Sequence, residues 1–280
     1  MTCLRPLLFS LSFAAVASLS RPAEKPTNAV DLQLTLQSLI HPFKTGDGWT
    51  QVHFRHSVAS EHAAIIICDM WDRHWCGGAT TRVEALAHRM APVLEQARAK
   101  SILIIHAPSD TMAFYAHAPG RLLAEQAPHA TPPSGIEPTE KEPPLPIDDR
   151  DGGCDTPGDQ EHQAWTRETP LLKIESGDVI SDKGTEIYNV LRQHHVNTVL
   201  MMGVHANMCI LNRSFGIRQL TRWGVHCILV RDLTDAMYNP ASWPHVSHSA
   251  GTNLVIEHIE KYWAPTVASD DLIRQLSTGS

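Results

Sequence analysis

Cys209 stands in a sequence context that suits a nucleophilic thiol. It follows the segment Gly203-Val204-His205-Ala206-Asn207-Met208, which comes directly after an apolar run ending at Met202. The residues beyond Cys209 have helical spacing, and a helix N-terminus stabilises negative charge and lowers the pKa of a thiol. The spacing leaves a second interpretation equally open, in which Cys209 is a small apolar residue beginning a core helix.

Two further polar residues follow apolar runs. Asp69 comes directly after Ala63 to Cys68, and His106 comes after Ser101 to Ile105. Ligands of open α/β sheets bind beyond the carboxyl ends of the strands, so we expect Asp69, His106 and Cys209 near one site. A carboxylate beside a thiol can accept its proton and so activate it for attack on a carbonyl.

The elements that must position these residues alternate between strand and helix patterns. Continuous apolar runs are typical of strands buried on both faces, and apolar positions three and four residues apart are typical of helices. This alternation predicts an α/β fold, a three-layer α/β/α sandwich with a mostly parallel, Rossmann-like sheet. We expect strands at 63–68, 101–105, 198–202 and 225–230, and helices at 81–99, 185–194, 209–223 and 251–263.

The chain divides into four expected segments. Residues 1–20 read as a secretory signal peptide, with a short basic start and an apolar stretch. Residues 21–60 form an N-terminal extension whose period-two apolar positions predict a β-hairpin. The main domain covers 61–265, with a Pro- and Gly-rich, lid-like insertion at 108–170, and a tail covers 266–280.

Composition and cysteine count narrow the function classes. The net charge of −7 and the lack of a Lys/Arg cluster argue against nucleic acid and membrane partners and favour a small-molecule substrate. A signal peptide implies an exported protein, periplasmic or extracellular. Five cysteines remain after its removal, so at least one thiol stays free. Cys76 and Cys154, in Gly-rich loops, could form one bridge.

Two motifs at matching places carry a resemblance to a known family. The Asp69-Met70 pair after an apolar strand, and Gly203-Val204-His205-Ala206-Asn207-Met208-Cys209 before a helix, resemble the isochorismatase-like cysteine hydrolase superfamily. This superfamily includes nicotinamidases, N-carbamoylsarcosine amidohydrolases and isochorismatases, and the match covers roughly residues 60–260. Isochorismatases proper lack the cysteine, so the thiol-using branch is the closer relative. The residues of these motifs resemble an uncharacterised exported subgroup of the superfamily rather than the nicotinamidases proper.

The resemblance implies a catalytic triad of Asp, Lys and Cys. Asp69 and Cys209 match the first and last members. Alignment on the Gly-Val strand puts Ser176 where the lysine is expected, and Lys173 is the candidate that a short slip would bring there. Lys183 is the alternative, and loss of the lysine in this subgroup is a third possibility.

The resemblance also implies a reaction and its surroundings. Asp69 would take the thiol proton, and Cys209 would form a thioester while cleaving an amide-type C–N bond. Backbone N–H groups around His205 and Cys209 would hold the oxyanion, and a cis peptide would join Val204 and His205. The family implies a homo-oligomer. An isochorismatase-type vinyl-ether hydrolase and a catalytically inactive small-molecule-binding protein are the alternatives.

The remaining expectations concern the pocket. Trp71 and His106, with Val204, His205 and Asn207 of the turn, are expected to contact substrate. The metal-ligand motif of nicotinamidases is missing after the second strand, so we expect neither a metal nor another cofactor.

Overall fold

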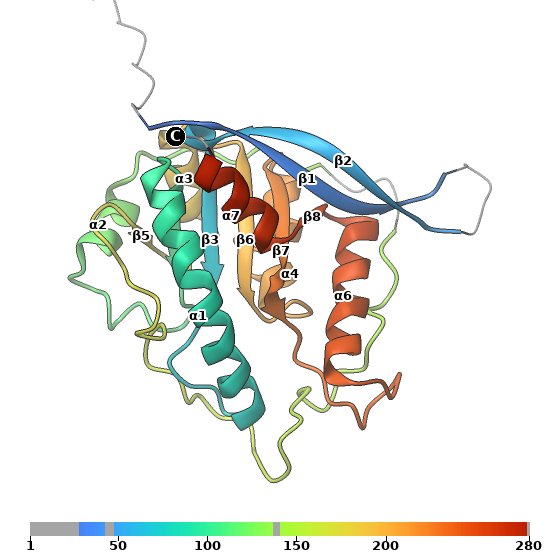
Figure 1. Ribbon diagram of the computed structural model, residues 1–280. Helices are drawn as coiled ribbons and strands as arrows, with labels where there is room; N and C mark the ends of the chain where they lie inside the picture. Colours follow the sequence, from blue (N-terminus) through green and yellow to red (C-terminus); the bar gives the residue numbers. More distant parts are fainter. Residues whose placement is uncertain (1–27, 43–47, 137–140, 279–280) are drawn as a thin grey trace, which may run out of the picture.

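A single eight-stranded sheet organises the chain. The computed structural model describes residues 28–42, 48–136 and 141–278. The strands lie in the order β2-β1-β8-β7-β6-β3-β4-β5, and β7, β6, β3, β4 and β5 run parallel (Figure 1). These parallel strands are β3 (Ala63–Cys68), β4 (Leu103–Ala107), β5 (Val179–Ile180), β6 (Thr198–Val204) and β7 (His226–Asp235).

Helices cover both faces of the sheet, as the predicted three-layer sandwich requires. On one face α1 (Gly77–Ala99) and α7 (Ser269–Thr278) pack against residues such as Ile65 and Ile67. The other face carries the remaining α-helices, which pack against Ile66 and its neighbours. Alternate residues of β3 therefore face opposite layers. The second layer contains α2 (Pro119–Gln126), α3 (Gly184–Gln193), α4 (Cys209–Asn212), α5 (Ile217–Arg222) and α6 (His248–Tyr262).

The predicted N-terminal hairpin joins the main sheet. Strands β1 (Asp31–Ile40) and β2 (Thr50–Ala59) pair antiparallel over ten positions, and β1 also pairs with β8 (Thr266–Val267). The segment expected as a tail thus contributes β8 and α7 to the folded unit, because Leu272 and Leu276 on α7 are buried against the sheet.

The helix predicted over 209–223 is broken, which corrects that expectation. It forms α4 and α5, separated by residues 213–216. The intervening chain turns inward, where Phe215 is fully buried and the Ser214 hydroxyl accepts a hydrogen bond from the Gly184 N–H at 2.9 Å. Burial of Phe215 in the core replaces the continuation of the helix.

The insertion at 108–170 contains α2 and otherwise little regular structure among its described residues. Its contacts fix it to the domain, through the Cys76–Cys154 disulfide and through Asp149, which accepts a hydrogen bond from Asn207. The expected signal peptide lies outside the described residues. Among the helices of the described ranges, none combines the length and apolarity needed to cross a bilayer.

Candidate active site

The turn after β6 presents Cys209 at the carboxyl edge of the sheet. Gly203 has φ +114°, and a Cβ there would collide with the Cys68 carbonyl oxygen on the adjacent strand. Glycine alone fits this close approach of β6 and β3. The expected cis peptide between Val204 and His205 is confirmed. The chain then enters α4, of which Cys209 is the first residue.

Asp69 occupies the corresponding position after β3 and is fully buried. Its backbone is left-handed, with φ 48°, a conformation that non-glycine residues adopt mainly where the surroundings enforce it. The N–H of Ser109 donates to Oδ1 at 2.7 Å, and Nε of Arg213 donates to Oδ2 at 3.0 Å. Burial raises the pKa of this carboxyl, although Arg213 and the hydrogen bonds act in the opposite direction.

Cys209 lies beside Asp69. Its thiol interacts with the carboxylate through charge and hydrogen bonding, and the His205 backbone N–H is directed at the sulfur. Burial raises the pKa of the thiol, the charge of Asp69 raises it further, and Arg213 opposes both. The expected lowering of this pKa by a long helix is therefore wrong for the resting site, where α4 has only four residues.

A cavity of about 440 Å³ opens beside Cys209. It lies between the turn that follows β6 and the insertion, so a small molecule placed there would reach the sulfur of Cys209. Its lining consists of Leu145, Asp149, Asn207, Met208, Cys209, Asn212 and Arg213.

Arg213 is the cation that contacts Asp69. Its guanidinium bridges Asp69 at 3.0 Å and Asp110 at 3.1 Å, and its charge bears on both Asp69 and Cys209. Burial alone would lower the pKa of Arg213, but Asp69 and Cys209 raise it well above its usual value. It is fixed as a cation. The position follows α4 immediately, four residues after Cys209, so a motif search for a lysine before the strand misses it.

Neither Lys173 nor Lys183, the two lysine candidates, reaches Asp69 and Cys209. Lys173 is exposed and lines a separate cavity beside α1, and its carbonyl accepts a hydrogen bond from Arg98. Lys183 pairs with Glu186 at 3.1 Å and is 60% exposed. The structure thus does not bring Lys173 to Asp69 and Cys209, because its loop runs beside α1.

The turn residues have distinct surroundings. His205 is buried, and burial, reinforced by the neighbouring His74, lowers its pKa to about 3, so its ring is neutral. Asn207 binds the Met237 backbone through its amide oxygen at 2.8 Å and its nitrogen at 3.0 Å, which fixes the turn to the end of β7. Val204 is fully buried in the strand. Of these three, Asn207 also lines the cavity.

Trp71 and His106 are enclosed within the protein, not exposed to the cavity beside Cys209. Trp71 stacks on Trp165 of the insertion with ring centroids 4.2 Å apart and donates from Nε1 to the Ser109 carbonyl. His106 is fully buried between Glu168, at 2.7 Å from Nδ1, and Asp178, at 3.2 Å from Nε2. The expectation that His106 lines the pocket is wrong, because two buried carboxylates hold its ring.

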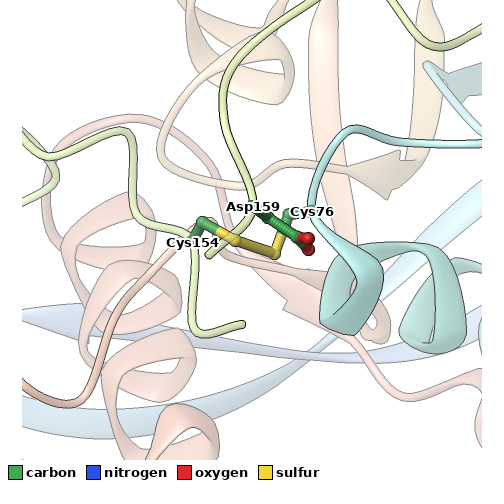
Figure 2. Close-up of side chains that lie close together, drawn as sticks. All are labelled: Cys76, Cys154 and Asp159. Atoms are coloured by element: carbon green, nitrogen blue, oxygen red, sulfur yellow. A yellow bond between two sulfur atoms is a disulfide. The ribbon is translucent and has the colours of Figure 1, made fainter. Parts of the chain in front are cut away.

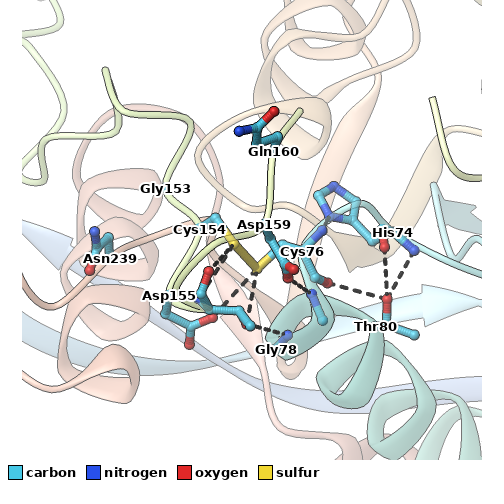
Figure 3. Close-up of a disulfide and its surroundings, with 12 residues drawn as sticks. His74, Cys76, Gly78, Thr80, Gly153, Cys154, Asp155, Asp159, Gln160 and Asn239 are labelled. Carbon is cyan, nitrogen blue, oxygen red and sulfur yellow. Dashed lines mark hydrogen bonds between the residues drawn. A yellow bond between two sulfur atoms is a disulfide. The ribbon is translucent and has the colours of Figure 1, made fainter. Parts of the chain in front are cut away.

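The possible Cys76–Cys154 bridge is confirmed. Their Cα atoms lie 5.6 Å apart, and Asp159 lies against the two sulfurs (Figure 2). Asp159 also accepts the Gly77 N–H at 2.7 Å. Figure 3 shows the surroundings of the bridge, with Asp155, His74 and Thr80 nearby. The bridge fixes the insertion to the start of α1. Cys68, Cys209 and Cys227 remain free thiols.

Comparisons with known proteins define the fold. A cysteine hydrolase from Pseudomonas syringae is similar over 80% of this chain and 96% of its own length, with 18% identity and a TM-score of 0.52. An isochorismatase from Pseudomonas putida aligns with 75% of this chain and 90% of its own, at 15% identity and a TM-score of 0.45. No family model and no curated protein sequence matches the chain. The chain has the isochorismatase-like fold.

Proposed function

We propose that this protein is a cysteine-dependent hydrolase that cleaves an amide-type C–N bond of a small molecule. The contact that carries the proposal is the hydrogen bond from the Cys209 thiol to Asp69, with Arg213 bound to the same carboxylate. A nucleophile, a base and an orienting cation within contact distance are what covalent acyl transfer requires. The cavity beside Cys209 gives the substrate its place.

The reaction begins with proton transfer. Asp69 accepts the thiol proton as the sulfur attacks the substrate carbonyl carbon, and the carbonyl oxygen becomes an oxyanion. The N–H of Cys209, one of the first in its helix, has no carbonyl partner within α4 and is suited to stabilise that oxygen. Asp69 then gives its proton to the departing nitrogen, the C–N bond breaks, and a thioester remains on Cys209.

Water completes the cycle. Asp69 removes a proton from the water that attacks the thioester carbon, and the C–S bond breaks to release the acid. The proton returns to the sulfur. Because Asp69 shuttles the proton, its raised pKa suits the role: a carboxyl that ionises too readily would be a poor proton acceptor. Arg213 keeps its proton throughout, so its contribution is electrostatic.

We also propose that the protein is exported and oligomeric. The disulfide Cys76–Cys154 supports export, since such bonds persist in oxidising compartments. Oligomerisation rests on the family resemblance and is checked by measuring mass in solution.

Trapping the thioester tests the proposed reaction. The protein is mixed with an activated aryl ester and with a panel of small primary amides, quenched in acid, and mapped by peptide mass. The expected result is an acyl group on Cys209, removed by hydroxylamine and absent from Cys209→Ser. A folded protein that releases no ammonia and forms no adduct even with the aryl ester would show that the raised thiol pKa reflects an inactive binding site.

A further inference from the structure

The charges around the cavity beside Cys209 do not balance. Arg213 is the one cation in its lining, and its guanidinium is already shared between Asp69 and Asp110. Asp182 also reaches this group, because its Oδ2 accepts the Asp110 N–H at 3.1 Å. A cation held between two carboxylates presents little positive charge to a ligand.

Asp149 places a negative charge on the wall of the cavity that the insertion forms. It belongs to the insertion, and its Oδ2 accepts a hydrogen bond from Nδ2 of Asn207 at 2.7 Å. Within the described chain its second oxygen, Oδ1, accepts no hydrogen bond. Asp149 is partly exposed and lines the cavity, so this oxygen remains available to a donor on a bound molecule.

The neighbouring charges have partners of their own. Asp148 pairs with Arg150 at 2.6 Å, and Glu142 pairs with Arg218 and His258. These pairs contribute little net charge to the cavity. Asp69, Asp110 and Asp149 with Arg213 leave a net negative charge beside the sulfur.

We propose that the cavity selects small substrates that carry a positive charge, an ammonium or guanidinium group, with Asp149 as the residue that recognises it. This inference rests on the proposed hydrolase function, since it names the substrate class of the same site. The cation would be held on the insertion side while the amide carbon lies at Cys209. Anionic substrates would meet Asp149 and Asp110 unfavourably.

Charged thiol reagents with one common reactive group test the selection. Methanethiosulfonates carrying a trimethylammonium, a hydroxyl or a sulfonate group each form a disulfide with the Cys209 sulfur and release methanesulfinate. The rate at Cys209 is followed by peptide mass mapping. We expect the cationic reagent to react more than about tenfold faster than the anionic one, with a ratio that falls as salt increases.

Two variants separate Asp149 from its surroundings. Asp149→Asn keeps the shape of the side chain and should lower the cation-to-anion ratio by about three- to tenfold. Asp148→Asn removes the same formal charge from the preceding residue, outside the cavity lining, and should leave the ratio unchanged. Ratios cancel any change in the reactivity of the thiol itself.

The outcomes distinguish the two proposals. Equal rates, or faster reaction with the sulfonate reagent, overturn the charge selection while leaving the hydrolase intact. An unchanged cation-to-anion rate ratio in Asp149→Asn would show that Asp149 does not recognise the positive charge. Failure of all three reagents to label Cys209 overturns the selection by showing that the sulfur is closed to molecules of this size. A charge preference without any acyl-enzyme supports the selection and contradicts only the hydrolase.

Discussion

Arg213 holds the same Asp69 carboxylate with which the Cys209 thiol interacts. Nε of Arg213 lies 3.0 Å from Oδ2, and Asp69 is fully buried while the arginine side chain is 29% exposed. The guanidinium of Arg213 thus compensates the buried negative charge of Asp69, and Arg213 itself lines the cavity beside Cys209. In this chain the cation beside Asp69 comes from the segment directly after Cys209 and α4.

Replacing Arg213 with methionine should lower both the free energy of unfolding and the rate of acyl-enzyme formation. A buried carboxylate that loses its partner costs about 3 to 5 kcal/mol of the free energy of unfolding. Arg213→Lys retains a positive charge and should keep part of the stability and of the acyl-enzyme formation. Urea titration and burst kinetics measure the two effects. Arg150→Met, which breaks an exposed pair with Asp148, is the control and should leave the free energy of unfolding nearly unchanged.

Asp69→Asn should separate thiol reactivity from catalysis. Removing the carboxylate removes one cause of the raised thiol pKa and leaves Arg213 in place, so simple alkylation by iodoacetamide at neutral pH should become faster by about tenfold for each unit that the pKa falls. Acyl transfer should fall by about 10²- to 10⁴-fold, because the proton acceptor is gone. Slower alkylation in this variant would contradict the arrangement of charges described above.

Stability should fall as pH rises through the alkaline range because of His106. Burial alone would lower the pKa of this imidazole, but the Glu168 charge and the hydrogen bonds to Asp178 and Glu168 outweigh burial and raise it to about 9. A histidine whose pKa is raised on folding stabilises the protein fully below about pH 6.5, and the contribution is lost as pH approaches 9. The expected loss is on the order of 3 kcal/mol.

The measurement is urea unfolding of the native protein and of His106→Gln from pH 6 to 9.5. The variant will be less stable throughout, but its decline with pH should be shallower. His53→Gln, on the exposed strand β2, should follow the native profile. Parallel curves for the native protein and His106→Gln would show that His106 does not hold its proton in the folded state.

Loss of the disulfide should destabilise the whole domain. Cys76 and Cys154 are 78 residues apart in sequence, and closure of such a loop is worth about 4 kcal/mol in the chain-entropy model. The Cys76→Ser/Cys154→Ser variant should therefore unfold at lower urea concentration. Adding a dithiol reductant should lower the native midpoint toward that of the variant and leave the variant unchanged. An effect of reductant on the variant would point to another cause.

The sequence predicted the elements of the domain better than their connections. Buried strands such as Ala63–Cys68 have continuous apolar runs, and α1 has an apolar stripe, so both types of element could be assigned from local patterns. The break after α4 could not, because it depends on Phe215 finding space in the core. The role of residues 266–278 in the sheet likewise depends on partners far away in the chain.

Position at the end of a strand predicted that Asp69 and Cys209 lie close together, and the structure places them side by side. The cation that contacts Asp69, Arg213, was not predicted. Nothing in the spacing of Arg213 distinguishes it from a surface residue of a helix; its contact with Asp69 arises because the helix ends at that residue. The burial of His106 depends on Glu168, contributed by the insertion, whose path has no periodic pattern to indicate it.

The order of strands has a consequence for how the protein acquires its shape during synthesis. β3 pairs with β6, and β1 reaches β8, so early segments depend on late ones for their neighbours. A nascent chain emerging from the ribosome would hold unpaired strand edges until the last residues appear. Such long-range parallel pairing is slow and exposes aggregation-prone edges. The β1–β2 hairpin and the β3–β4 pair can form early, but the central sheet is complete only once β6, β7 and β8 have been synthesised.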